Sequence, residues 1–156
     1  MEASEEGEDL IKYYEGFEKY VYKDSNNINT IGYGHALKPG ENYKFVTKEQ
    51  AENILKEDIK FAEECVNRLV KVQLKQNEFD ALVSFVYNIG VGSFARSTAL
   101  KYLNMKDYKN ALKWWAKWIK NRKKEILPGL VKRRKKEIEL FNNNIYLNNE
   151  EINELF

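Results

Sequence analysis

Residues 15–35 read EGFEKYVYKDSNNINTIGYGH, and this stretch decides how the chain can fold. It begins at the expected end of a helix and contains two short runs of residues that favour strands, Tyr20–Tyr22 and Ile28–Ile31. A polar cluster that favours turns, Asp24–Asn27, lies between the two runs. The pattern predicts a β-hairpin that directly follows a helix.

A helix is predicted from Ser4 to Glu15. Acidic residues in its first turn suit the positive end of a helix dipole, and Gly16 follows where a helix stop is expected. Helical spacing predicts a buried stripe made of Leu10, Ile11, Tyr14 and Phe17. Glu15 is therefore expected to be the last helical residue, close to the start of the hairpin.

Asp24 and Thr30 are the polar residues of the hairpin whose side chains are best suited to take part in a reaction. If the register sets Asp24 opposite Thr30, both side chains lie on one face, whereas a slip of one residue separates them. Gly32 and Gly34 alternate with other residues after the second strand. Glycines in this pattern allow another surface or a ligand to approach the backbone closely.

The rest of the chain is predicted to be mainly helical. A loop is expected over residues 38–46, and Thr47 with Gln50 forms a capping box that begins a long helix. Further helices are predicted over residues 78–88, 97–103, 108–119 and 130–141, with a Pro-Gly pair at 128–129 separating the last two.

Length and composition indicate one globular domain. The chain has 156 residues, of which 43% are hydrophobic and 32% are charged. Cys65 is the only cysteine, so no disulfide can form within the chain. No apolar run reaches the roughly 18–20 residues of a membrane span. The acidic N-terminus is also unlike the start of a signal peptide.

Charge is distributed unevenly although the formal net charge is only +2. Residues 1–20 hold seven acidic and two basic side chains, whereas residues 101–140 hold fourteen basic and four acidic ones. The basic half is compatible with an anionic partner, such as nucleic acid, an anionic membrane or an anionic cell-wall polymer. Solvated helix faces explain the same pattern equally well.

Glu15, Asp24 and Thr30 together suggest glycoside cleavage, which commonly uses two carboxyl groups in different environments. The negative end of a helix and partial burial beside aromatic residues disfavour the charged form of Glu15, which suits a general acid. A polar turn favours ionised Asp24, and Thr30 can help to hold a water molecule. Each residue also has an ordinary structural explanation, as a helix-end, turn or strand residue respectively.

With these three residues and their spacing, the sequence resembles the phage-type lysozymes, glycoside hydrolase family 24, whose members serve as endolysins. In that family Glu, Asp and Thr occur at the same spacings of nine and six residues and form the catalytic triad. Three later blocks also resemble the family, namely QNEFDALVSFVYNIG at 76–90, FARSTALKYLN at 94–104 and PGLVKRRKKE at 128–137. The resemblance runs from about residue 9 to residue 141.

The resemblance implies an α+β, mostly α, lysozyme-like fold in a single domain spanning residues 1–156. A small lobe with the β-hairpin, about 14–58, would be joined by a long helix to an all-α large lobe. The large lobe would comprise about 66–156 together with the N-terminal helix. The cleft would lie between the two lobes.

The implied reaction is hydrolysis of the β-1,4 bond between N-acetylmuramic acid and N-acetylglucosamine in peptidoglycan. Glu15 would be the general acid, while Asp24 and Thr30 would position water on the opposite face of the sugar. The resemblance also suggests that the cleft is lined by Tyr87, Asn88 and Ser97.

The expected partner is the glycan strand of peptidoglycan, and the protein is expected to act as a monomer without metal, cofactor or nucleic acid. We expect synthesis in the cytoplasm of a bacterial host and action on the cell wall or periplasm, and we expect no signal peptide in the sequence as given. Two other functions stay open. A lytic transglycosylase needs the Glu acid but not the Asp–Thr pair, and an inactive glycan- or nucleic-acid-binding protein needs neither.

Several other side chains have competing explanations. His35 is the only histidine and, without a cluster of further ligands, is interpreted as structural. Trp115 is predicted to lie in the core, whereas Trp114 or Trp118 is a candidate for the cleft. Arg133 lies in a basic run, and burial against an acidic side chain is one explanation for it.

Overall fold

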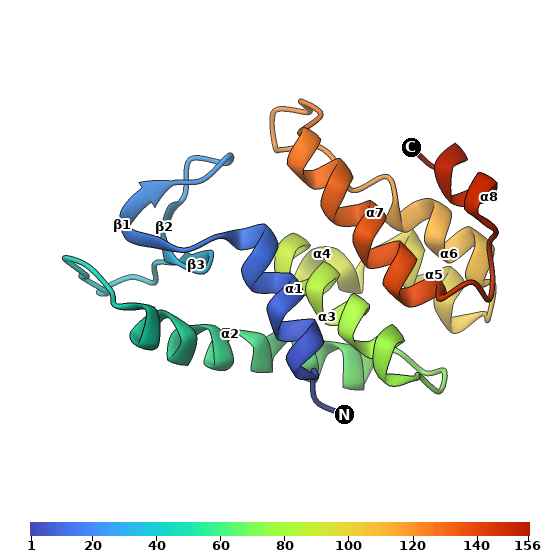
Figure 1. The fold of residues 1–156 in the computed structure, drawn as a ribbon, viewed down its shortest axis with the longest axis horizontal. Helices are drawn as coiled ribbons and strands as arrows, with labels where there is room; N and C mark the ends of the chain where they lie inside the picture. The colour runs from blue at the N-terminus through green and yellow to red at the C-terminus, as the bar shows by residue number, and fades with distance from the viewer.

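The structure, a computed structural model, describes all 156 residues. It contains three short strands, with one helix before them in the chain and seven helices after them (Figure 1). In chain order the elements are α1 (Glu5–Glu15), β1 (Glu18–Lys23), β2 (Asn29–Gly32), β3 (His35–Ala36), α2 (Lys48–Leu69), α3 (Gln76–Ile89), α4 (Val91–Ala95), α5 (Thr98–Asn104), α6 (Tyr108–Trp115), α7 (Pro128–Asn142) and α8 (Asn149–Glu154).

The strands and most of the helices gather at opposite ends of the molecule. The antiparallel sheet has the order β1-β2-β3, and α2 runs from beside it to the helical end (Figure 1). Thr47 caps α2, and Gln50 completes the predicted capping box. This arrangement confirms the predicted α+β, mostly α fold with two lobes, while the boundaries of the lobes stay a prediction.

The structure gives the register of the hairpin, which the sequence left open. Tyr22 pairs with Thr30, and the N–H of Asp24 donates to the carbonyl of Ile28, so Asp24 does not lie opposite Thr30. Asp24 and Thr30 are instead diagonal neighbours across the two strands. The turn closes tightly because Asn27 adopts a φ of 63°, a left-handed conformation that asparagine tolerates better than most residues.

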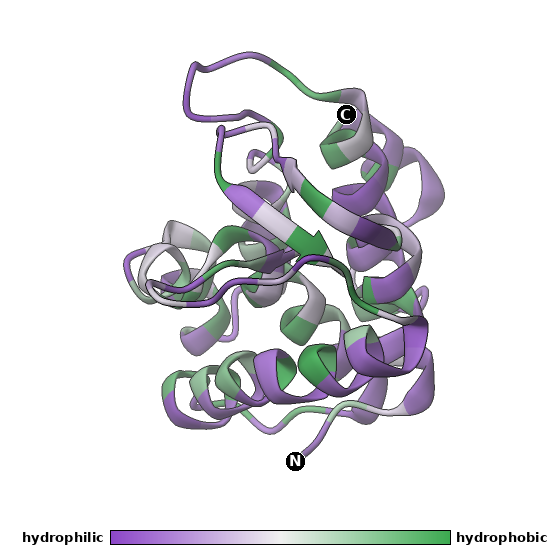
Figure 2. Cartoon of the chain, turned by 90° about the vertical axis from the view of Figure 1, so that its left-hand side faces the viewer, coloured by the Kyte–Doolittle hydropathy of each residue, from purple (hydrophilic) through white to green (hydrophobic).

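The C-terminal half differs from the prediction at several element ends. Helix α6 ends at Trp115 rather than at Ile119, because the following chain turns back on itself as a small hairpin. This hydrophilic loop rises at the top of the molecule (Figure 2). Pro128 begins α7 instead of separating two helices, which suits proline because the first helical position needs no N–H. The short elements β3, α4 and α8 were not predicted.

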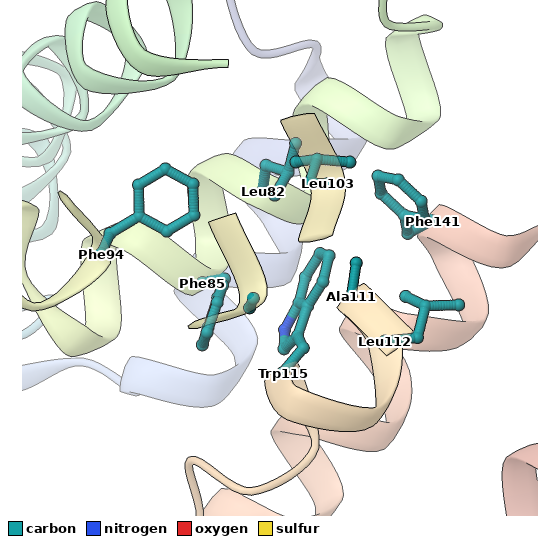
Figure 3. A pocket seen from close by; sticks show the side chains of 9 residues that line it. Leu82, Phe85, Phe94, Leu103, Ala111, Leu112, Trp115 and Phe141 are labelled. Carbon is teal, nitrogen blue, oxygen red and sulfur yellow. The ribbon is translucent and has the colours of Figure 1, made fainter. Parts of the chain in front are cut away.

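Helix α3 is the centre of the large lobe and packs against α1, α2 and α7. Residues 78–86 are buried without interruption, as expected for a helix that other elements surround. Phe85 stacks on Trp115 with ring centroids 4.8 Å apart, in a tight apolar cluster (Figure 3). Trp115 is 2% exposed, which confirms its predicted core position, while Trp114 and Trp118 are half-buried against the core. Helix α3 therefore provides a rigid base for the residues at its C-terminal end.

Candidate active site

Glu15 lies at the C-terminal end of α1, as the sequence predicted. Gly16 has a φ of 69°, and its N–H donates to the carbonyl of Lys12, so the chain leaves the helix directly after Glu15. The side chain of Glu15 is 16% exposed and lines an open pocket of about 460 Å³. Other residues lining this pocket are Tyr13, Tyr14, Asn88, Leu127, Gly129, Leu130, Lys132 and Arg133.

Gly34 is the point at which the hairpin end meets Glu15. A Cβ atom placed on Gly34 would lie 2.7 Å from Cδ of Glu15 and closer still to its Oε1. Gly34 also has a φ of 73°, a conformation that glycine adopts without strain. The close approach that the alternating glycines predicted is therefore made by the carboxyl group of Glu15.

Arg133 holds the other side of the Glu15 carboxylate. Its Nη1 donates to Oε2 of Glu15 at 2.5 Å, and its Nε lies 3.2 Å from Oε2 of Glu137. Arg133 is 3% exposed, and burial by itself lowers its pKa, but the two carboxylates outweigh burial and raise it. The contact confirms burial of Arg133 against an acid. The sequence indicated only the helix end and the aromatic neighbours of Glu15. The structure adds a cationic partner, Arg133.

Glu137 connects this ion pair to a second arginine. Arg134 is fully buried, and its Nε lies 2.9 Å from Oε1 of Glu137. Burial lowers the pKa of Arg134 to about 10, which leaves it charged at neutral pH. Its Nη2 donates to Oδ1 of Asn88 at 2.7 Å. Two cations and two carboxylates thus form a balanced network that fixes both Glu15 and Asn88.

Asp24 and Thr30 are joined through the backbone of Ile28. Asp24 Oδ1 accepts the N–H groups of Asn26 and Ile28 at 2.8 and 2.9 Å, while its Oδ2 accepts none from the protein. The hydroxyl of Thr30, which is 3% exposed, donates to the carbonyl of Ile28 at 2.8 Å. The Thr30 oxygen therefore keeps its lone pairs, and Asp24 keeps one free oxygen, for an outside donor.

Tyr87 lines a pocket, whereas Ser97 is buried at the start of α5. The Tyr87 hydroxyl donates to the carbonyl of Tyr33 at 2.8 Å, and burial, followed by the charge of Glu15, raises the pKa of Tyr87. Tyr87 lines a second pocket of about 220 Å³ beside Gly34. Ser97 is 7% exposed and caps α5, accepting the N–H of Leu100 at 3.1 Å. The structure thus gives the Ser97 hydroxyl a structural partner within its own helix.

His35 connects the sheet to α2. Its Nδ1 lies 2.7 Å from Asp58 Oδ2, and its Nε2 lies 3.0 Å from Glu41 Oε1. The hydrogen bond with Asp58 raises the pKa of His35, burial opposes the rise, and Glu41 adds to it. The N–H of Lys38 is the main cause of a lowered pKa at Glu41. His35 is thus a buried histidine with both ring nitrogens satisfied, which supports its structural interpretation.

We expect Asp58→Asn to destabilise the protein more in acid than in base. The pKa of His35 is raised in the folded protein, so protonated His35 stabilises the fold. This stabilisation is complete below the unfolded pKa of about 6.5 and disappears as pH rises through the folded pKa. The loss should be about 1.5–3 kcal/mol near pH 5.5 and smaller near pH 9, measured by urea unfolding. Glu57→Gln, an exposed neighbour paired only with Lys60, is the control. A loss of stability in Asp58→Asn of the same size at both pH values would contradict this account.

The fold and the site together define a class of protein. A helix-end glutamate lines a pocket and contacts Gly34 at the end of a β-hairpin that carries Asp24 and Thr30, and a long helix joins the two lobes. This is the architecture of a lysozyme-fold glycosidase. No cluster of three or more histidine, cysteine or carboxylate side chains is placed to hold a metal ion. Among the helices, none combines the length and the apolar character needed to cross a membrane.

Comparisons with known proteins give the family. The sequence pattern of the family described as phage lysozyme matches residues 12–137. The endolysin of Acyrthosiphon pisum secondary endosymbiont phage 1 is 44% identical over 146 residues, which cover 90% of this chain and 98% of the relative. The chain therefore belongs to the phage lysozyme family and is a cell-wall glycosidase of the endolysin type.

Solved structures agree with this assignment. The muramidase domain of SpmX from Asticaccaulis excentricus superposes with a TM-score of 0.81 at 34% identity, covering 90% of this chain and 97% of that domain. The endolysin from Escherichia coli O157:H7 phage FAHEc1 gives a TM-score of 0.78 at 38% identity, covering 95% and 98% respectively. The match in fold therefore extends over nearly the whole chain.

Proposed function

We propose that this protein is a muramidase that hydrolyses the β-1,4 bond between N-acetylmuramic acid and N-acetylglucosamine in the host cell wall during lysis. Glu15 is the general acid, and Asp24 and Thr30 position the attacking water. The observation that carries the proposal is the placement of Glu15. Its side chain lines an open pocket, and its carboxyl group is held between the backbone of Gly34 and the guanidinium of Arg133. We propose a monomer as the active form.

The buried network allows Glu15 to change its protonation state. Arg133 contacts two carboxylates, so when Glu15 takes up a proton the guanidinium still faces the buried charge of Glu137. A buried cation left without a partner would be strongly destabilising, and Glu137 avoids this cost. Protonated Glu15 can then donate to the glycosidic oxygen as the bond breaks.

Asp24 and Thr30 supply the other half of the reaction. Oδ1 of Asp24 accepts two backbone N–H groups, which hold the carboxyl group in place at the turn. The free Oδ2 of Asp24 and the lone pairs of Thr30 can accept the two protons of one water molecule. That water would attack the anomeric carbon from the face opposite the leaving group, which gives inversion.

Tyr87 and Asn88 are the proposed substrate contacts at the end of α3. Because Arg134 occupies Oδ1 of Asn88, the amide N–H groups of Asn88 are available to a sugar hydroxyl or an acetamido carbonyl. The hydroxyl of Tyr87 is already bound to Tyr33, so Tyr87 would contribute the face of its ring. Ser97 has no comparable free group, and its contribution would be to hold the segment after α4.

Mass analysis of fragments from purified peptidoglycan tests this proposal. Hydrolysis leaves reducing-end muramic acid, whereas the rival lytic transglycosylase leaves an anhydro end. Reducing ends whose release requires Glu15 are the expected result. Anhydro ends would replace the proposal by the transglycosylase, and a wild-type protein without activity would leave only a binding function.

A further inference from the structure

The segment between α6 and α7, residues 119–127, is a small hairpin that we call the basic hairpin. Lys120 and Ile126 form an antiparallel bridge, and the side chains of Asn121 and Glu125 close the turn. The N–H of Leu127 donates to the carbonyl of Ile119 at 3.0 Å. The basic hairpin is therefore a defined element of the structure, seen as the hydrophilic loop at the top of Figure 2.

The basic hairpin contacts the other lobe beside the candidate active site. The N–H of Arg122 donates to Oδ1 of Asn26 at 2.9 Å, and the N–H of Asn26 donates to Asp24 at 2.8 Å. Two hydrogen bonds thus connect the basic hairpin to the carboxylate proposed to hold water. At the other end of the hairpin, Leu127 lines the pocket that contains Glu15. The hairpin consequently spans the edge of the cleft.

The charge of the basic hairpin is not compensated within the protein. Lys120, Arg122, Lys123 and Lys124 are exposed, and none of them lies within 4.0 Å of an acidic oxygen. The single acid of the segment, Glu125, bonds to Asn121 instead. Four like charges so close together repel one another, so folding alone does not account for them. Their position at the cleft edge suits an anionic group on a molecule bound there.

We propose that the basic hairpin is a specificity element that binds the carboxylates carried by the peptide stems of the glycan strand. The inference rests on the proposed function, because the strand must lie in the cleft for its substituents to reach Arg122, Lys123 and Lys124. The hairpin acts on substrate binding, whereas bond cleavage depends on Glu15. Its contribution therefore falls mainly on KM.

The test compares two variants on two substrates. One variant carries Arg122→Gln, Lys123→Gln and Lys124→Gln. The control carries Lys101→Gln, Lys106→Gln and Lys113→Gln, which remove the same charge from exposed sites on α5, α6 and the turn between them, away from both cleft pockets. The substrates are peptidoglycan freed of phosphate polymers by hydrogen fluoride and the same material with its carboxylates converted to neutral amides. Thermal unfolding verifies that both variants are folded.

We expect the hairpin variant to raise KM roughly tenfold on the carboxylated substrate with kcat nearly unchanged, and to match the wild type on the amidated substrate. The control variant should change KM less than about twofold. Equal losses in both variants would overturn the proposal in favour of general charge attraction. An unchanged KM of the hairpin variant on the carboxylated substrate, or an equal rise on the carboxylated and the amidated substrates, would overturn it as well. Absence of cleavage by the wild type would instead refute the proposed function.

Discussion

Glu15→Gln is expected to reduce the release of reducing ends from peptidoglycan at least about a thousandfold, because glutamine cannot donate a proton to the leaving oxygen. The change preserves the shape of the side chain and leaves an amide oxygen for Arg133. Glu137 still lies 3.2 Å from Arg133 but then faces both buried arginines alone, so the variant should fold with some loss of stability. Activity is measured by fragment analysis and folding by circular dichroism and thermal unfolding.

Glu6→Gln is the matched control, since Glu6 lies exposed in the first turn of the same helix. It should retain nearly wild-type activity. If Glu15→Gln cleaved peptidoglycan at a rate close to the wild type, Glu15 would not be the general acid and the proposed mechanism would fail.

Local sequence signals predicted much of this structure because the interactions behind them are short-range. The capping box of Thr47 and Gln50 fixes the start of α2, and Gly16 fixes the end of α1, within a few residues of chain. The same signals placed Glu15 at a helix end beside the hairpin. The position of the candidate acid could thus be read from the sequence.

The register of the hairpin could not be read in the same way. It depends on which turn residue takes the left-handed conformation, and Asn26 and Asn27 are equally suitable in the sequence. The structure gives that conformation to Asn27. The resulting pairing places Thr30 opposite Tyr22, so a choice at one residue decided which side chains face each other.

The network around Arg133 shows the limit of local patterns most clearly. The pairing of Arg133 and Arg134 with Glu137 follows from helical spacing within α7. The contact between Arg133 and Glu15, by contrast, joins residues 118 positions apart. No periodicity encodes such a contact, because it arises only when α1 and α7 are brought together around α3.

Gly34→Ala is expected to lower kcat on peptidoglycan by about a hundredfold or more, because it disturbs Glu15 directly. The new Cβ would lie 2.7 Å from Cδ of Glu15, so the carboxyl group must move away from its position beside Arg133. The change also introduces backbone strain, since Gly34 has a φ of 73°, and this strain should cost about 1–2 kcal/mol of stability.

Gly40→Ala separates these two effects. Gly40 has a φ of 88°, and a Cβ there would meet no atom within 4 Å, so the variant carries the strain without the contact. Both variants should lose a similar amount of stability in thermal unfolding, but only Gly34→Ala should lose most of its activity. Equal losses of activity would assign the effect to strain alone. A fully active Gly34→Ala would mean that the position of Glu15 beside Gly34 is not needed for the reaction.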